Sequence, residues 1–176
     1  EIIFLDKDRA EVRYLNQIKG KTKLSNVELA ICLIKKSPLE LIFQKAAELG
    51  VSKIIPVISE RTEIKDLNYI RAKKILVEAT EQSNQLNPPI ISDVIKLKDF
   101  LKNLGTSNLL LFADINSKRK LTLDNSKKFK IYTILIGPEG DFTSNERELI
   151  LKNSNTRDFT ISDNILRSET AVISAI

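Results

Sequence analysis

The sequence has no histidine, no methionine, no tryptophan and a single cysteine among its 176 residues. Without histidine, a Ser-His-Asp triad, a histidine base and a histidine metal ligand are excluded. The lone thiol of Cys32, inside the apolar run VELAICLI, excludes internal disulfides and cysteine-rich metal sites. No apolar run approaches the roughly 18 residues of a membrane span. These absences predict a cytoplasmic protein that uses no metal and has no membrane partner.

The charge balance and the first residues give two weaker indications. The 28 Lys and Arg residues exceed the 23 Asp and Glu residues, an excess that suits an RNA-binding surface and an ordinary protein surface alike. Because the chain begins at Glu1 and contains no methionine, we expect the natural protein to be longer. Residues 1–26 alternate as in a β-hairpin, which is too small to fold alone. We interpret them as the remnant of an N-terminal β domain.

From Val27 onward, apolar strands alternate with amphipathic helices. Ser37, Pro38 and Glu40 predict a capping box at the start of a helix that ends at Gly50. Later helices are predicted near residues 68–83 and 96–103, from Thr143 and from Ser168. Thr143 and Glu146 predict a second capping box at the start of the third of these helices. The apolar strands are expected at residues 27–34, 53–59, 108–114, 131–137 and 158–162. This order predicts an α/β fold with a parallel sheet covered on both faces, and a ligand site at the carboxyl ends of its strands.

The stretch LIGPEGDFTSNE joins one of these strands to a helix. Gly137 and Gly140 allow a ligand to approach the backbone closely, yet the dinucleotide pattern G-x-G-x-x-G and the P-loop pattern are both absent. Glu139 and Asp141 would repel a phosphate, so the turn favours a ligand that is neutral or cationic. A plain connection between a strand and a helix explains these residues equally well.

A second stretch, TISDNILRSETA, places two apolar residues in a polar loop. Ile165 and Leu166 are unfavourable there unless something covers them. Arg167 follows, and Ser168 then caps a helix with Glu169 in its first turn. An apolar pair flanked by an arginine and acids could receive an adenosine, although a hydrophobic plug under a neighbouring loop is also consistent with the residues.

In combination, LIGPEGDFTSNE and ILRSETA, with QKAAELGVSKIIPVISERT and EQSNQLNPP upstream, resemble the RsmE family over about residues 37–171. This family comprises the 16S rRNA uridine-N3 methyltransferases of the SPOUT superfamily. The resemblance implies an α/β-knot methyltransferase domain at 27–176, in which the C-terminal segment threads through an earlier loop. Residues 1–26 would be the last strands of a PUA-like, RNA-binding β-barrel. It also implies a homodimer that methylates a uridine in the decoding region of the small ribosomal subunit.

The resemblance further implies that S-adenosylmethionine is the cofactor and that three segments hold it. Its cofactor-binding residues would be Leu111, Phe112 and Asp114 at one strand end, Ile136, Gly137, Pro138, Glu139 and Gly140 at the glycine turn, and Ile161, Ser162, Ile165, Leu166 and Thr170 in the last loop and helix. The candidates for contact with RNA are Lys45, Arg61, Gln82 and Arg167. A solvated helix face for Lys45 and a loop salt bridge for Arg61 are equally good explanations.

Several positions depart from the family pattern. Asp141 stands where a second glycine is usual, Ser162 replaces a glycine and Asn164 replaces an arginine. Gln85 and Asn87 stand where basic residues are common. A Cβ at position 162 would crowd a ligand, and fewer arginines would weaken phosphate contacts.

The absence of histidine also bears on mechanism. Uridine N3 becomes a nucleophile only when its proton leaves, so the base must be a carboxylate, a water molecule or the RNA itself. Glu169 and Glu139 are the candidates, although stabilisation of a helix dipole explains Glu169 nearly as well. Arg167 would hold the uracil oxygens as negative charge develops, or grip a phosphate. Two alternatives stay open: a knotted methyltransferase for another RNA base or a ribose, and a non-catalytic RNA-binding assembly protein.

Overall fold

The computed structural model describes residues 1–17, 25–121 and 129–176. Part of the expected N-terminal remnant, residues 18–24, therefore lies outside the described residues. Over the described ranges, none of the helices combines the length and the apolar character needed to cross a bilayer.

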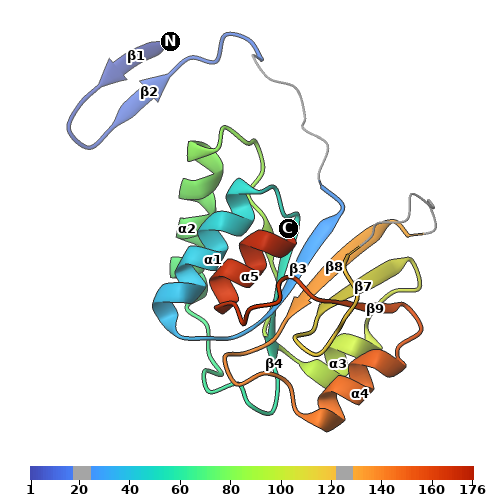
Figure 1. Ribbon diagram of the computed structural model, residues 1–176. Coiled ribbons are helices and arrows are strands. Elements are labelled where there is room, and N and C mark those ends of the chain that lie inside the picture. Colours follow the sequence, from blue (N-terminus) through green and yellow to red (C-terminus); the bar gives the residue numbers. More distant parts are fainter. Residues whose placement is uncertain (18–24, 122–128) are drawn as a thin grey trace.

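A parallel sheet forms the centre of the molecule (Figure 1). Its described strands run in the spatial order β5-β4-β3-β8-β7-β9, with β6 also paired to β4, and every pairing is parallel. The strands are β3 (Val27–Cys32), β4 (Lys53–Ile58), β5 (Ile90–Ile91), β6 (Ile95–Lys96), β7 (Asn108–Ala113), β8 (Ile131–Ile136) and β9 (Thr156–Phe159). The carboxyl ends of the three neighbours β8, β7 and β9 consequently meet at one edge of the sheet.

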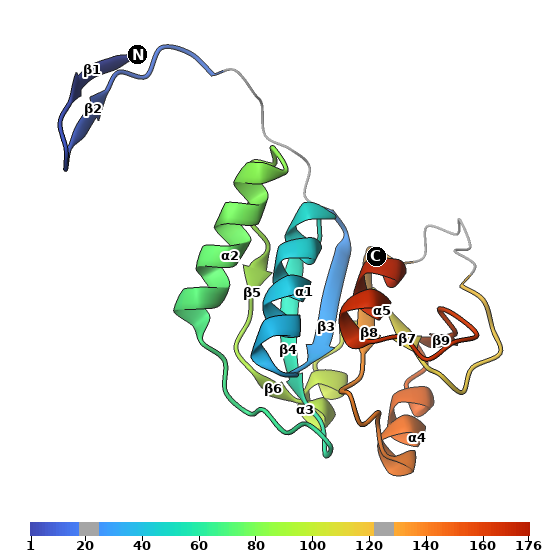
Figure 2. The same cartoon turned by 60° about the vertical axis from the view of Figure 1, so that its left-hand side comes forward.

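Helices cover both faces of this sheet (Figures 1 and 2). One face packs against α1 (Lys36–Glu48), α2 (Tyr69–Gln82) and α5 (Ser168–Ala175). The other packs against α3 (Leu97–Lys102) and α4 (Ser144–Lys152). The alternation of a strand divides the core in the same way, because Leu29 and Ile31 of β3 join the first cluster while Ala30 and Cys32 join the second. The predicted parallel sheet with two covered faces is confirmed.

The C-terminal segment lies against an earlier loop. After β9, at the edge of the sheet, the Thr160 N–H donates to the Arg119 carbonyl at 2.7 Å, and Thr160 pairs with Lys120 as an isolated bridge. The chain then returns to α5, which lies beside α1 (Figure 2). This path is consistent with the knotted fold that the resemblance implies.

Two predicted boundaries are wrong. The first helix has Lys35 as its N-cap with no side-chain cap, so the capping box from Ser37 to Glu40 does not form. The Glu40 carboxylate instead accepts hydrogen bonds from Arg71 of α2 at 3.0 and 3.3 Å, and this bonding lowers the pKa of Glu40. The last strand is Thr156–Phe159 rather than residues 158–162, because its partner β7 ends at Ala113, opposite Phe159.

The N-terminal residues form the predicted hairpin. β1 (Ile2–Leu5) pairs antiparallel with β2 (Ala10–Val12), and every residue of both strands is exposed. The assignment of this hairpin to a PUA-like domain stays a prediction.

Cys32 is the last residue of β3, and its thiol interacts with Ser59 and Thr62 of the loop that follows β4. Its side chain is completely buried, and this burial raises the pKa of the thiol to about 12. We expect alkylation by iodoacetamide at pH 8 to be at least ~100-fold slower in the native protein than in the denatured one, because only the exposed thiolate reacts. Mass spectrometry after timed labelling measures this ratio, and rapid native labelling would contradict the buried assignment.

Candidate active site

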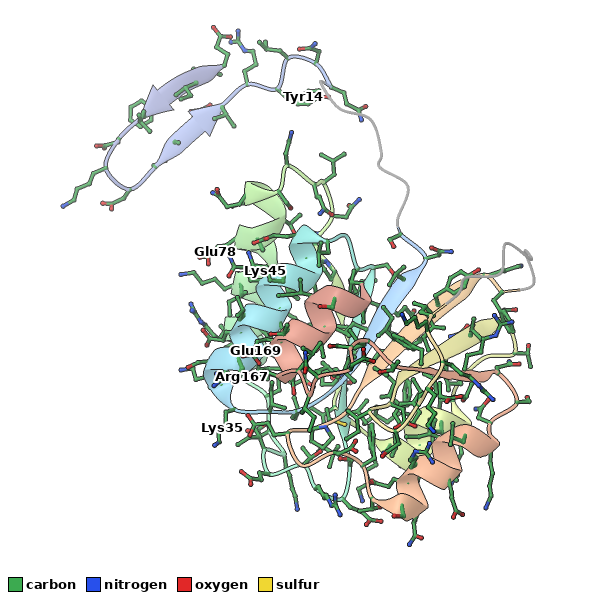
Figure 3. All side chains as sticks on the ribbon, in the orientation of Figure 1. Tyr14, Lys35, Lys45, Glu78, Arg167 and Glu169 are labelled. Atoms are coloured by element: carbon green, nitrogen blue, oxygen red, sulfur yellow. The ribbon has the colours of Figure 1, made fainter. Side chains whose placement is uncertain are left out.

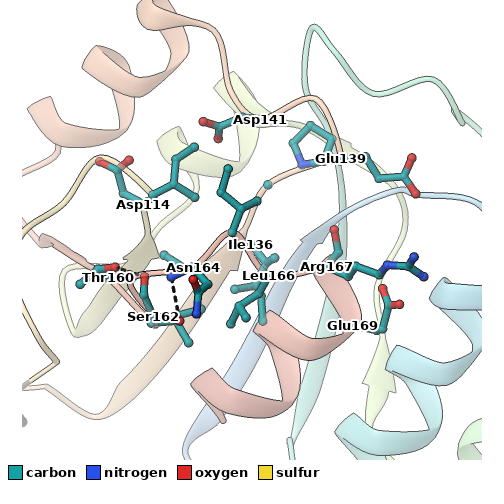
Figure 4. A pocket seen from close by; sticks show the side chains of 18 of the residues that line it. Asp114, Ile136, Glu139, Asp141, Thr160, Ser162, Asn164, Leu166, Arg167 and Glu169 are labelled. Atoms are coloured by element: carbon teal, nitrogen blue, oxygen red, sulfur yellow. Dashed lines mark hydrogen bonds between the residues drawn. The ribbon is translucent and has the colours of Figure 1, made fainter.

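A cavity of about 480 Å³ opens where the connections after β7, β8 and β9 converge (Figure 4). Its walls also include Pro38 from the first turn of α1 and the start of α5. The volume falls within the range of small-molecule sites, and the location is the usual one for ligands of parallel α/β sheets. We call this cavity the strand-end pocket.

The turn after β8 is held by a hydrogen bond from the Asp141 N–H to the Pro138 carbonyl at 2.9 Å. A Cβ on Gly137 would lie only 3.0 Å from the ring of Phe142, which is buried and packs edge-to-face on Phe112. A side chain at position 137 would therefore force the buried Phe142 ring to shift beneath the turn. A Cβ on Gly140 would meet ordinary contacts at 3.6 Å, so this glycine is not sterically required.

A network of hydrogen bonds fixes the helix that follows the turn. The predicted capping box of α4 is present, with Thr143 and Glu146 bonded reciprocally. Glu146 is 4% exposed, and its second oxygen accepts the Glu60 N–H at 2.8 Å. Arg61 adds a hydrogen bond from Nη1 to the Gly140 carbonyl at 2.8 Å. The loop after β4 thus braces the pocket turn from outside.

An ion pair between the half-buried Arg147 and the buried Asp114 forms the part of the pocket at the end of β7. Arg147 of α4 donates a hydrogen bond from Nε to Asp114 Oδ2 at 2.8 Å, and its Nη2 atom lies 2.7 Å from the same oxygen. The other oxygen of Asp114 accepts hydrogen bonds from the Asn116 N–H at 2.9 Å and from its side-chain amide at 3.3 Å. The hydrogen bond to Asp114 raises the pKa of Arg147. Both carboxylate oxygens of Asp114 are thus held by neighbouring residues, and its side chain forms a fixed part of the pocket wall.

The connection after β9 supplies the opposite wall. Ser162 uses its hydroxyl to accept the Asn164 N–H at 3.0 Å, and its carbonyl accepts the Thr160 hydroxyl at 2.9 Å. These bonds make the loop a defined turn. Leu166 is half-buried, whereas Ile165 is 85% exposed although it lines the pocket.

Three charged side chains that we proposed for chemistry lie together on one side of the pocket in Figure 4. Glu139 comes from the turn after β8, while Arg167 and Glu169 come from the start of α5. Arg167 is the N-cap residue of α5, so the expected cap at Ser168 is displaced by one position. Figure 3 shows Arg167 and Glu169 near the beginning of α1, from which Pro38 joins the same pocket lining.

Most of the proposed cofactor-binding residues line this one cavity. They are Asp114, Ile136, Gly137, Pro138, Glu139, Ile161, Ser162, Ile165 and Leu166. Four others are not part of its described lining. Leu111 and Phe112 are buried inside the sheet, Gly140 faces Arg61, and Thr170 is exposed on α5.

Several residues of the lining were not among the proposed catalytic or cofactor-binding residues, although the charge of Asp141 was considered in the turn. These are Pro38, Ala113, Ile115, Asp141, Thr160, Asp163, Asn164, Ser168 and Ala171. All but one lie close in sequence to residues that were proposed. Longer stretches of sequence around the three strand ends would therefore have included them. Pro38 comes from a distant helix and gave no such signal.

The residues proposed for RNA contact do not converge. Lys45, labelled on α1 in Figure 3, forms an ion pair with Glu48 of the same helix at 2.8 Å. Arg61 binds the Gly140 carbonyl, which agrees with a structural role in its loop. Gln82 is exposed at the end of α2. Of these candidates, Arg167 lines the pocket, and the RNA contacts stay predictions.

Fold and pocket together define a parallel α/β protein with its ligand site at the strand ends, and comparison with known proteins specifies the class further. The RNA methyltransferase domain family matches residues 20–176. A ribosomal RNA small subunit methyltransferase E from Rickettsia conorii is 39% identical over 175 residues, covering 98% of this chain and 71% of that protein. The chain therefore belongs to the RNA methyltransferase domain family and, within it, to the RsmE family, which confirms the resemblance.

Solved structures agree with this assignment. The crystal structure of the Neisseria gonorrhoeae ribosomal RNA small subunit methyltransferase E, bound to S-adenosyl methionine, superposes with a TM-score of 0.86 at 28% identity. It covers 99% of this chain, and this chain covers 73% of it. The SpoU methyltransferase AviRb from Streptomyces viridochromogenes, at 14% identity and a TM-score of 0.53, shares the fold over 84% of this chain and 56% of its own. The SPOUT-type α/β fold is thus confirmed.

Proposed function

We propose that this protein methylates N3 of a uridine in the decoding region of 16S ribosomal RNA, with S-adenosylmethionine as the methyl donor. The observation that carries the proposal is the convergence of the three strand-end segments on one cavity. The names of the relatives support the RNA substrate, and the cofactor bound to the Neisseria enzyme supports the donor.

The residues of the pocket fit this cofactor. Ile136, Ile161 and Leu166 offer apolar surface for an adenine ring, and the lining carboxylates suit a ligand with cationic groups. A phosphate-bearing cofactor is disfavoured by the same carboxylates. When bound, S-adenosylmethionine supplies a methyl group activated by its sulfonium centre.

The protein's own side chains then have two tasks. Glu139 or Glu169 would take the N3 proton of the uridine, directly or through water. Both residues line the pocket on the same side as Arg167 (Figure 4). Arg167 would stabilise the uracil oxygens as negative charge develops on the deprotonated ring. Holding the base against the pocket supplies much of the remaining acceleration.

The proposal includes a homodimer that acts in the cytoplasm. Leu41 of α1 and Ile173 of α5 are exposed apolar side chains on two helices that contact each other, and a protein partner would cover them. We propose that the partner is a second copy of this chain.

Cofactor binding is tested by calorimetric titration with S-adenosylhomocysteine. We expect saturable binding by the wild type and at least tenfold weaker binding by Gly137→Ala, because the added Cβ displaces Phe142 under the turn. Gly105→Ala is the matched control, since its Cβ would meet only an ordinary 3.5 Å contact with Asn108. No binding by a folded wild type would overturn the cofactor assignment and favour the non-catalytic alternative.

The methylated nucleotide is tested with small ribosomal subunits that lack the modification. Incubation with the protein and S-adenosylmethionine, followed by digestion and mass spectrometry, should yield N3-methyluridine in the decoding region. A methyl group on another base or on a ribose would favour the second alternative.

A further inference from the structure

Asp141 occupies a backbone conformation that side chains rarely adopt. Its φ is +58°, in the left-handed region, and apart from Asn84 no other described non-glycine residue has a positive φ. Asp is one of the few side chains that tolerate this region, and glycine would be favoured on conformational grounds. The residue lines the strand-end pocket. A carboxylate at a position suited to glycine therefore raises the question of what the charge does.

Local hydrogen bonding accounts for only part of the answer. Asp141 Oδ1 accepts the N–H of Phe142 at 2.8 Å, which helps hold the turn. An asparagine would make the same bond without a charge and also tolerates the left-handed region. The negative charge is therefore not needed for the turn itself.

The carboxylate lies beside the floor of the pocket. An ideal Cβ on Gly137 would be 3.6 Å from Asp141 Oδ1, so the charge sits next to the backbone where β8 ends. Asp141 also contributes to the raised pKa of Arg147, after the larger effect of Asp114. In Figure 4 its side chain projects from the turn on the side of Asp114.

The charges around this position are unbalanced. Among the described residues of the lining, Asp114 is neutralised by Arg147, and Arg167 is the one basic residue of the lining itself. The remaining carboxylates of the lining are Glu139, Asp141, Asp163 and Glu169. Such a pocket attracts a cation more strongly than a neutral molecule of the same shape.

We propose that Asp141 is a specificity-determining residue that makes the pocket distinguish the cationic methyl donor from its neutral product. The inference rests on the proposed function, in which methyl transfer converts a sulfonium cation into the neutral thioether of S-adenosylhomocysteine. The two molecules differ by one methyl group and one positive charge. A carboxylate close to the sulfur stabilises the donor alone, and so favours replacement of spent product by fresh donor.

The test compares the dissociation constants of S-adenosylmethionine and S-adenosylhomocysteine by calorimetry. Asp141→Asn keeps the shape and the hydrogen bond to Phe142, and Asp141→Gly relieves the backbone conformation. In both variants we expect the ratio Kd(product)/Kd(donor) to fall by about three- to tenfold, mainly through weaker binding of the donor. The difference between wild type and variants should shrink as salt is raised to ~0.5 M, because a half-exposed charge is screened.

Asp93→Asn is the matched control, because it removes one negative charge at an exposed position outside the pocket lining and should leave the ratio unchanged. Thermal melts verify that each variant is folded. If both ligands bind and the ratio stays within twofold of the wild type in both Asp141 variants, the inference is wrong while the proposed function stands. If neither ligand binds the wild type, the proposed function fails instead.

Discussion

Replacing Arg167 with alanine should lower the rate of methyl transfer to small ribosomal subunits by about 10²–10³-fold, the effect of removing one group that stabilises developing charge. Arg167 lines the strand-end pocket beside Glu139 and Glu169, and no other basic residue belongs to the described lining. Its side chain makes no cap on α5 and is exposed, so the fold should be unaffected. Single-turnover kinetics at saturating donor measure the loss directly.

Two further variants separate charge from geometry. Arg167→Lys keeps the positive charge but loses the planar fork, so it should recover only part of the rate if two uracil oxygens or a phosphate are bound. Arg157→Ala removes an exposed arginine of β9 outside the pocket lining, and should leave the rate unchanged. Titration with S-adenosylhomocysteine should give nearly the same affinity in all three. A normal rate in Arg167→Ala would exclude this residue from the chemistry.

The regular parts of the fold follow from sequence patterns. The buried residues of α1 are Leu39, Ile42, Phe43, Ala46 and Ala47. Their apolar spacing of three and four residues is typical of a helix that buries one face. The capping box of α4 was equally predictable from the sequence, since its two partners, Thr143 and Glu146, lie within one helical turn of each other. Local patterns of this kind need no knowledge of the tertiary structure.

The start of α1 shows where local patterns mislead. Pro38 is accommodated anywhere in the first helical turn, because the first N–H groups of a helix have no partner within it. The Leu39 N–H bonds the Lys35 carbonyl at 3.1 Å, which moves the helix start upstream of Ser37. Glu40, meanwhile, pairs with Arg71 on a different helix. Only the packing of α1 on α2 decides between the two arrangements.

The pocket was predictable as a set of loops but not residue by residue. Parallel strands place their carboxyl ends together, so the three motifs were expected to meet. Which side chains face the cavity depends on where each strand ends. Because β7 continues to Ala113, Leu111 and Phe112 stay in the core, and the pocket begins at Ala113 and Asp114. The partner of Asp114 lies 33 positions away and carries no sequence signal.

That partner, Arg147, gives the largest expected change in stability. Arg147→Met should lower the free energy of unfolding by about 3–5 kcal/mol, the cost of leaving a buried charge without its partner. The side chain of Asp114 is only 2% exposed and would lose the hydrogen bond from Nε and the ion pair with Nη2, while methionine restores much of the lost volume. Urea denaturation followed by circular dichroism measures the difference. Lys152→Met on the same helix is the control, because its pair with Glu148 is exposed and should contribute within ~0.5 kcal/mol.

A double variant identifies the cause of this loss. If the uncompensated charge of Asp114 is responsible, Asp114→Asn combined with Arg147→Met should be more stable than Arg147→Met alone, by about 1–3 kcal/mol, because a neutral amide needs less compensation when buried. If instead the packing of Arg147 is responsible, the second substitution should add its own loss. The first outcome would show that α4 holds the wall of the strand-end pocket through charge, so that any variant of this pair should also weaken binding of S-adenosylhomocysteine. The second outcome would show that packing holds this wall, and the ion pair would then have no special role in forming the pocket.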